Sequence, residues 1–339
     1  MPDLPSLVGG RQNCLCHISN IGPKRSPHAP YAGYLLPWRE GMTRRRVIVL
    51  TTDECEKSRG AGQAIAQALA SRQMDTTIEN VGSDLDLHLR RVQPLAAFVS
   101  LPEHSPWLSR TLGLLEFLRI PHTGSSNLTS SVCRDRVKTL RLLGAGGLPV
   151  PTHVVLHKDY LDDARIHLSS LNVPVEVCSA MADGESTVVT NPKSLQAAAS
   201  VALAHGTRAV AYELPTSKRI SAFALDQTFL GTVETEEKTS AMKAASLPPS
   251  LVSHVARMCR QAHQILDCSG LIEVNFLVSD LHPISVLGVV PNPNLHPQSK
   301  AVQAAAQNGT DFDQLVGDVA EQTFRNAQEE QKGAQRGVG

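Results

Sequence analysis

The stretch from residue 114 to residue 149 constrains the fold of this 339-residue chain more than any other. It joins two expected helices, an apolar one over 112–118 and a second over 134–143, through the hexapeptide Ile-Pro-His-Thr-Gly-Ser at 120–125. Three glycines close the second helix, which is a common way for a helix to end. The predicted boundary between the first two domains, at residues 133 and 134, lies within this stretch.

Size and composition indicate a soluble protein of several subdomains. A chain of this length exceeds what one core usually spans, so two or three subdomains are expected. The 32 basic and 32 acidic residues cancel and only 4% of residues are aromatic, which argues against nucleic acid as a partner. No apolar run approaches the roughly 18 residues of a membrane span, and no apolar signal-peptide core opens the chain. We therefore expect no membrane partner.

The seven cysteines are odd in number and scattered, a pattern typical of reduced thiols rather than of a disulfide framework. This pattern predicts a cytoplasmic protein. The cluster Cys14-x-Cys16-His17 could hold a metal, but no second ligand pair follows at zinc-finger spacing. An incidental cluster in the terminal segment is the alternative interpretation.

Both ends of the chain lack a secondary-structure pattern. Residues 1–43 are rich in Pro, Gly, Arg and His without helical or strand periodicity, and we expect a disordered extension there. Alternatively, the residues before Met42 reflect a start site placed too early. The Gln-, Gly- and Arg-rich residues 330–339 are expected to form a frayed tail.

Strands and helices alternate in the first part of the chain. Short apolar strands are expected at 47–50 and 95–99, with an alanine-rich helix over 61–70 between them. Such alternation implies right-handed crossovers and a parallel sheet. We therefore predict an N-terminal α/β domain over 44–133.

Two further α+β lobes are expected, a central one over 134–230 and a C-terminal one over 231–329. The central lobe should contain strands at 150–156, 173–178, 187–190, 209–213 and 221–225, and a helix over 194–204. The C-terminal lobe should contain helices over 250–266 and 311–329 and strands at 271–278 and 284–290. The predicted fold class is α/β with α+β lobes.

The motifs of the chain resemble the D-alanine–D-alanine ligases of the ATP-grasp superfamily. The resemblance is dense in two stretches, residues 114–151 and residues 267–276 with 287–312. The first contains the hexapeptide at 120–125, the pair Asp135-Arg136, and Gly-Leu-Pro-Val-Pro at 147–151. The resemblance implies an ATP-grasp fold, ATP and Mg²⁺ as cofactors, amino acids as substrates, and a homodimer by analogy.

The resemblance also assigns nucleotide-binding positions to individual residues. Retained candidates are Arg136 for a phosphate, Ser186 in the loop 183–187, Glu213 at the adenine hinge, and Lys238 near the γ-phosphate. Two positions carry other chemistry. The family lysine that reaches the phosphates is Cys178, and the glutamate that holds the ribose is Ile220.

The metal positions are altered most. The family supplies an Asp, a Glu and an Asn, and these positions are Asn275, Gly288 and Val290 here. Mg²⁺ normally requires oxygen ligands, and glycine and valine offer none from their side chains. A family arginine corresponds to Glu273, which shares a strand face with Asn275, so these two could hold one weakly bound metal. A polar strand face that meets solvent is the alternative.

No catalytic residue can be assigned with the family pattern. Glu56 could replace the carboxylate that binds the substrate ammonium, and Lys238 could act at the γ-phosphate. His104 and His122 could act as general bases, but they lack positioned partners in the sequence and a structural role is the alternative.

Three functions remain open at this stage. The first is a degenerate ATP-grasp protein that binds nucleotide weakly or not at all and acts as a regulatory module or as the partner of another protein. The second is a working carboxylate–amine ligase of the D-Ala-D-Ala type that forms an acyl phosphate. The third is a binding protein that senses nucleotide through retained adenine contacts.

Overall fold

The structure of the protein is a computed structural model that describes residues 45–54, 56–160, 168–181, 186–204, 206–214, 218–235, 242–279 and 283–336. The predicted N-terminal extension, the cysteine–histidine cluster at 14–17, the loop at 183–185 and the candidate Lys238 lie outside the described residues. Within the described residues, no helix is both long and apolar enough to cross a membrane.

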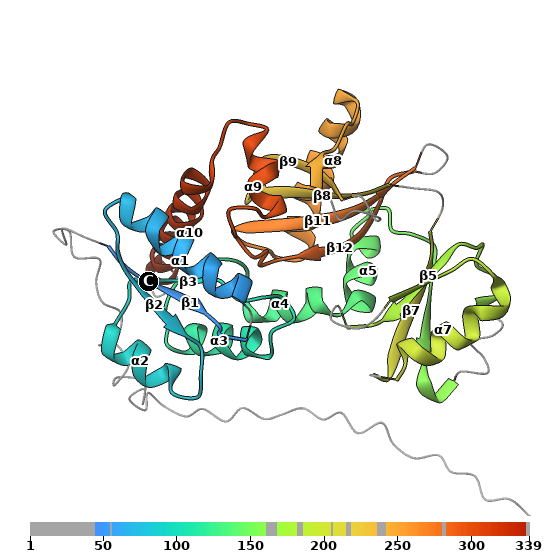
Figure 1. Cartoon of the computed structure of the whole chain (residues 1–339), viewed down its shortest axis with the longest axis horizontal. Coiled ribbons are helices and arrows are strands. Elements are labelled where there is room, and N and C mark those ends of the chain that lie inside the picture. Colours follow the sequence, from blue (N-terminus) through green and yellow to red (C-terminus); the bar gives the residue numbers. More distant parts are fainter. Residues whose placement is uncertain are drawn as a thin grey trace, which may run out of the picture. The chain divides into compact units, whose positions relative to one another are not determined.

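The first domain contains the predicted parallel sheet, whose three strands have the order β2-β1-β3 (Figure 1). Its elements are β1 (Arg46–Thr51), α1 (Glu56–Ser71), β2 (Asp75–Asn80), α2 (Leu85–Val92), β3 (Ala96–Val99) and α3 (Pro106–Phe117). Val47 and Val49 of β1 belong to a core with α1, while Ile48 and Leu50 belong to a core with α2 and α3. Because both faces are covered, β1 is apolar at every central position.

Helix α5 (Arg136–Ala145) lies within two residues of the helix predicted over 134–143, and α4 (Asn127–Arg134), which was not predicted, precedes it. Asp135 separates them. Its backbone is extended, and its side chain accepts a hydrogen bond from the Lys138 N–H as the N-cap of α5. The predicted helix began two residues early because its start was not placed after this capping aspartate.

A four-stranded antiparallel sheet of order β4-β7-β5-β6 follows. Its elements are β4 (His153–His157), η1 (Lys158–Tyr160), β5 (Val175–Ser179), β6 (Ser186–Val189), η2 (Pro192–Ser194), α7 (Leu195–Ala202) and β7 (Arg208–Glu213). Helix α7 covers one face, where Leu195 and Ala199 pack with Val175 and Val177. The strands lie within three residues of their predicted positions.

The last sheet is antiparallel, with five strands in the order β10-β9-β8-β11-β12. Its elements are β8 (Lys218–Leu225), β9 (Thr228–Thr235), β10 (Met242–Ala244), α8 (Pro249–Ile265), β11 (Leu271–Val278), β12 (Ser285–Val290), α9 (Lys300–Ala306) and α10 (Phe312–Arg336). Strand β8 precedes the predicted domain boundary at residue 230, yet it pairs with β11 along its whole length. Ile272, Val274 and Phe276 share a core with α8, which leaves alternate residues of β11 for the other face.

Helix α5 contributes to two cores. Val137 and Leu140 pack with β5 and β7 of the four-stranded sheet. One turn later, Leu143 packs in the core that α8 forms with the five-stranded sheet. These three side chains are at most 2% exposed.

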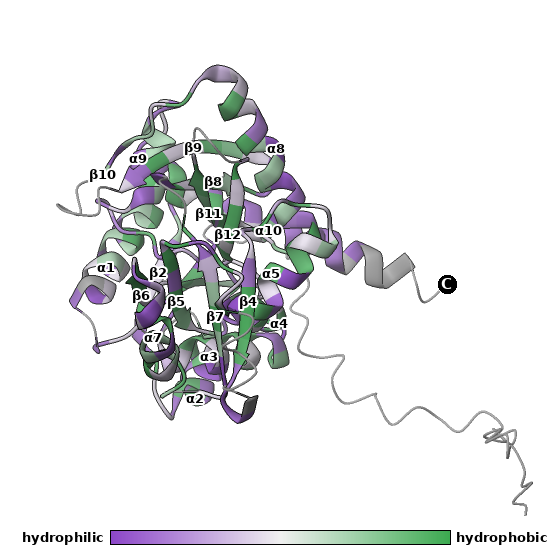
Figure 2. Ribbon diagram, turned by 90° about the vertical axis from the view of Figure 1, so that its right-hand side faces the viewer, coloured by the Kyte–Doolittle hydropathy of each residue, from purple (hydrophilic) through white to green (hydrophobic). Residues whose placement is uncertain are grey.

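Polar composition explains why sequence analysis did not predict strand β2. Strand β2 is an edge strand of sequence Asp-Thr-Thr-Ile-Glu-Asn with mostly exposed side chains, so it lacks the apolar pattern of a buried strand. Helix α10 continues to Arg336, past residue 330, where the predicted tail begins. The central strands of the sheets are mainly hydrophobic (Figure 2).

Candidate functional site

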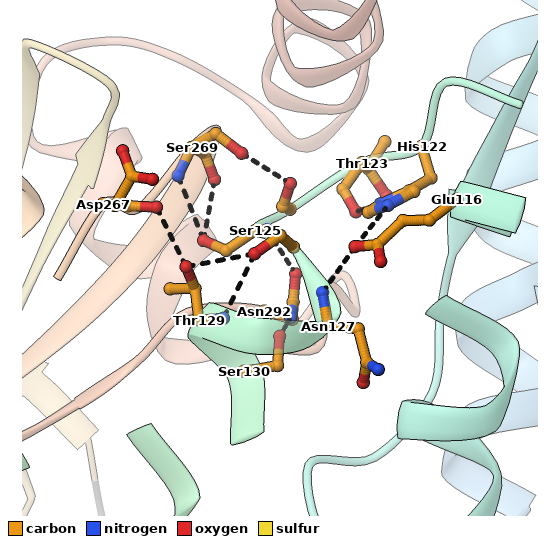
Figure 3. Close-up of polar contacts among 12 residues, drawn as sticks. Glu116, His122, Thr123, Ser125, Asn127, Thr129, Ser130, Asp267, Ser269 and Asn292 are labelled. Carbon is orange, nitrogen blue, oxygen red and sulfur yellow. Dashed lines mark hydrogen bonds and ion pairs between the residues drawn. The ribbon is translucent and has the colours of Figure 1, made fainter. Parts of the chain in front are cut away.

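The two motif-rich stretches of the sequence meet in a hydrogen-bonded network around Ser125 and Asn292 (Figure 3). The Ser125 N–H donates to Asn292 Oδ1 at 2.8 Å, and Asn292 Nδ2 donates to Ser130 Oγ at 2.6 Å. The Ser269 N–H donates to Ser125 Oγ at 3.0 Å. We call these residues, with Gly124, the serine–asparagine network. It attaches the hexapeptide loop to the segments before β11 and after β12.

Gly124 is required in this network by its geometry. Its φ is +82°, a left-handed conformation that favours glycine, and a Cβ here would lie 1.5 Å from Asn292 Oδ1. Its carbonyl accepts a hydrogen bond from Ser269 Oγ at 2.8 Å. The glycine of the hexapeptide therefore serves packing rather than chemistry.

The altered metal positions lie side by side on one face of the five-stranded sheet. Asn275 of β11 is the register partner of Gly288 on β12 and of Ser221 on β8, and Glu273 is the partner of Val290. These five residues form what we call the polar face. Ser221 Oγ donates a hydrogen bond to Asn275 Oδ1 at 2.9 Å. An added Cβ at Gly288 would meet no atom within 4 Å, so there is open space above it.

Lys300, the first residue of α9, carries its ammonium group to the polar face. Its Nζ lies 3.6 Å from Glu273 Oε1 and donates a hydrogen bond to Ser221 Oγ at 3.3 Å. The Glu273 side chain is 15% exposed and the Lys300 side chain 35% exposed, so the pair is partly shielded from solvent. The polar face thus already contains a cation that belongs to the chain.

A second charged cluster links the two antiparallel sheets. Arg219 of β8 donates to Glu176 Oε2 of β5, and the Tyr212 hydroxyl donates to the same oxygen. Burial acts to raise the pKa of Glu176, but the Arg219 charge and hydrogen bonds from Tyr212, Arg219 and Ser186 outweigh it, so this pKa is lowered. Glu176 is therefore an ionised, 4% exposed carboxylate.

Arg136, the first residue of α5, lies beside the same cluster. Burial acts to lower its pKa, but the nearby Cys178, Tyr212 and Glu176 outweigh burial and raise it. Burial also raises the pKa of the Cys178 thiol, which therefore stays neutral near pH 7. Both arginines of this region are thus in contact with groups of their own chain.

The chain was compared with proteins of known sequence and structure. No protein-family model matches it. D-alanine–D-alanine ligase from Desulforudis audaxviator is 29% identical over 311 residues, which are 84% of this chain and 99% of that protein. The ligase from Trichlorobacter lovleyi is 26% identical over 303 residues, 83% of this chain and 96% of that protein.

Solved structures show the same fold. The D-alanine–D-alanine ligase from Bacillus anthracis complexed with ATP matches with a TM-score of 0.75 at 20% identity, covering 85% of this chain and all of that chain. The enzyme from Coxiella burnetii matches with a TM-score of 0.73 at 17% identity, covering 87% and 98%. This chain is a D-alanine–D-alanine ligase-like protein of the ATP-grasp superfamily.

The remaining nucleotide candidates of this ligase-like protein are spread over several elements. Ser186 begins β6 and hydrogen-bonds Glu176. Glu213 ends β7, where its Oε1 accepts hydrogen bonds from the N–H and side-chain amide of Asn172 at 2.8 and 2.9 Å. Ile220 is buried in the core with α8, so the neighbouring Arg219, not Ile220, occupies the opposite face of β8.

Three catalytic candidates lie at or near the ends of elements in the first domain. Glu56 is exposed at the start of α1, and His104 is exposed before α3. His122 lies 3.2 Å from the Thr123 carbonyl and 3.9 Å from Glu116, and burial lowers its pKa.

The donor set of the polar face does not fit Mg²⁺. Mg²⁺ needs near-octahedral oxygen coordination and usually one or two carboxylates. Glu273 is the only carboxylate of the polar face, and Lys300 is already paired with it. Among the described residues, no group of three or more His, Cys, Asp or Glu could hold a metal ion.

Sequence analysis missed Lys300, Asn292 and Glu176. Lys300 has a weak local signal, because a lysine at the first position of a helix is slightly unfavourable with the helix dipole. Asn292 stands between two prolines, which indicates a fixed turn but not a partner. Glu176 interrupts the apolar alternation of β5, and a buried charge within a strand normally has a partner.

Proposed function

We propose that this ligase-like protein binds a nucleotide weakly and acts as a regulatory module in the cytoplasm without synthesising a dipeptide. The observation that supports this most strongly is the lack of metal-binding carboxylates at the altered positions of the polar face. Asn275, Gly288 and Val290 are neighbours there, and they supply no carboxylate for a divalent cation. In-line phosphoryl transfer needs metal ions that neutralise the developing charge.

The charges around the polar face favour weak anion binding. Arg136, Arg219 and Lys300 are offset by the carboxylates of Glu176 and Glu273. A nucleoside triphosphate carries about four negative charges, which this small surplus of positive charge attracts but does not neutralise. The four described cysteines are free and buried, in agreement with a reducing compartment.

Titration calorimetry with ATP and an ADP-release assay with D-alanine test this function. We expect a dissociation constant on the order of 0.1–1 mM and no ADP release above background. ADP release that depends on D-alanine would contradict the proposal. Absence of ATP binding under every condition would contradict its nucleotide-binding half.

Restoring the ligands gives the matching gain-of-function test. The variant Gly288→Glu, Val290→Asn, Asn275→Asp should bind Mg²⁺ more tightly than the native protein. Open space at Gly288 leaves room for the new carboxylate. Calorimetry with MgCl₂ measures the gain, and an unchanged affinity would contradict the role assigned to these positions.

The alternative is an active ligase, and the extent of the similarity favours it. The match covers 99% of the Desulforudis audaxviator ligase, so no domain of that enzyme is missing here. In such a reaction, the γ-phosphoryl group passes from ATP to a carboxylate, giving ADP and an acyl phosphate. An amine then attacks the acyl carbon, releases phosphate and loses a proton. Detection of dipeptide by mass spectrometry would support this alternative.

A further inference from the structure

The Lys300 ammonium is held in place by both strand and helix contacts. Residues Ala301, Ala304 and Ala305 of α9 are almost completely buried against the five-stranded sheet. At Gly231 of β9, an added Cβ would lie 2.5 Å from the Ala304 carbonyl oxygen, so helix and strand are in close contact. Lys300 is therefore anchored at the start of a fixed helix, and its side chain reaches Glu273 and Ser221 from there.

An ammonium group and a divalent cation compete for the same oxygens at this position. Lys300 neutralises Glu273, the one carboxylate that a metal would need, and its positive charge repels a second cation nearby. The other side-chain oxygens of the polar face are also engaged, because Ser221 Oγ accepts a hydrogen bond from Lys300 Nζ and donates one to Asn275 Oδ1. The oxygens that could bind a metal are thus engaged by the chain itself.

The same ammonium is suited to bind an anion. A lysine has three N–H donors, and Lys300 has one hydrogen bond to Ser221 and an ion pair with Glu273. Asn275 lies between Ser221 and Gly288 in the sheet, so the open space above Gly288 borders the same row of residues. An anionic group there could receive a donor from Lys300 without any metal.

We propose that Lys300 takes the place of a divalent cation on the polar face, so that a phosphate group of a nucleotide binds there without metal. This inference rests on the proposed nucleotide binding. The inference goes further, because it specifies that Lys300 Nζ neutralises the ligand and predicts that chelators do not weaken binding.

Calorimetry with ATP in EDTA and in MgCl₂ tests the metal independence. The native protein should bind ATP with affinities that agree within about threefold in the two buffers. Lys300→Met should weaken binding in EDTA about tenfold or more, since a charge-assisted hydrogen bond is lost. Lys300→Arg should keep most of the affinity, and Lys193→Met, which removes an exposed lysine of η2, should keep all of it.

Two results would overturn the inference in this experiment. One is native binding that is at least about tenfold tighter in MgCl₂ than in EDTA. The other is Lys300→Met binding equal to native binding in EDTA, with circular dichroism showing that the variant is folded.

Mn²⁺ binding, followed by electron paramagnetic resonance, tests the inference without nucleotide. The native protein and Lys193→Met should not bind Mn²⁺ at micromolar concentration. Lys300→Met combined with Gly288→Glu, Val290→Asn and Asn275→Asp should bind it at least about tenfold more tightly than the triple variant that keeps Lys300, and equal affinities would overturn the inference. Micromolar Mn²⁺ binding by the native protein would overturn the inference. If ATP binds in neither buffer, nucleotide binding fails as a function, and this arm alone decides whether Lys300 replaces a metal.

Discussion

The serine–asparagine network and the polar face both lie in stretches that resemble the ligase family, but they differ in which family residues they keep. The network keeps the motif residues Gly124 and Ser125, and each has a packing or hydrogen-bonding reason to be there. The polar face has Gly288 and Val290 where the resemblance implies metal ligands. The motif residues of the serine–asparagine network therefore indicate the fold, while the residues of the polar face indicate which chemistry is possible.

Burial explains why the two regions respond differently to substitution. Ser125 and Asn292 are at most 8% exposed, and a buried polar group that loses its partner costs about 1–3 kcal/mol of stability. The polar face is partly exposed, and a changed side chain there can be hydrated. Its chemistry can therefore change while the fold stays intact.

Gly124→Ala should have the largest effect. The new Cβ would overlap Asn292 Oδ1 at 1.5 Å, in addition to the strain of a φ of +82°, so we expect a loss of roughly 4 kcal/mol or more, or no folding. Gly147→Ala is the matched control, because Gly147 has a φ of +85° with no atom near its Cβ. Urea unfolding measures both, and equal losses would show that the clash does not matter.

Asn292→Ala should come next. It leaves the Ser125 N–H and the Ser130 hydroxyl without their partner, which should cost about 2–4 kcal/mol. The nearby Asn294→Ala removes a single 3.4 Å contact to Ser100 and serves as control. If Asn292→Ala lowers the free energy of unfolding by urea less than the control does, Asn292 does not stabilise the network.

Glu176→Gln should give a smaller, pH-dependent loss. The folded-state pKa of Glu176 lies below the unfolded value, so the carboxylate contributes stability above the unfolded pKa and loses it as pH falls through the folded pKa. We expect a cost of about 1–3 kcal/mol at pH 7 that shrinks below about pH 4.5.

Unfolding of the native and Glu176→Gln proteins between pH 7 and pH 3 measures this difference. Asp75→Asn is the control, since the Asp75–Arg46 pair is more than half exposed and should contribute little. A stability difference that grows toward low pH would contradict the assignment of an ionised Glu176.

Glu273→Gln should have the smallest effect on stability and an effect on binding instead. Its partly exposed ion pair with Lys300 should contribute less than about 1 kcal/mol. Removing its negative charge should strengthen ATP binding in EDTA about three- to tenfold. Calorimetry and urea unfolding measure the two quantities. If Glu273→Gln lost as much stability as Asn292→Ala, the polar face would be as important for the fold as the serine–asparagine network, which contradicts the comparison.

The fold was predictable where pattern and motif agree. Strand β11 was predicted at its observed limits, residues 271–278, because apolar residues alternate along it and the family motif fixes its register. Strand β2 was not predicted, since an exposed edge strand carries no apolar period. Helix α5 was predicted within two residues of its limits, but its start was placed before Asp135, which caps α5 and also ends the unpredicted α4.

The site was less predictable because its contacts join distant residues. Glu273 and Asn275 were predicted to share a face by strand alternation, and they lie on the face opposite α8. Their neighbour Lys300 comes from a helix beyond β12, and Glu176 meets Arg219 43 residues away. Strand periodicity fixes which way a side chain points but not which distant group it meets.

Helix α5 has a consequence for how the protein melts. Because Val137 and Leu140 are part of one core and Leu143 is part of another, neither antiparallel sheet can lose its packing without disturbing the same ten-residue helix. Heat should therefore release both sheets in a single cooperative transition, with calorimetric and van't Hoff enthalpies that agree.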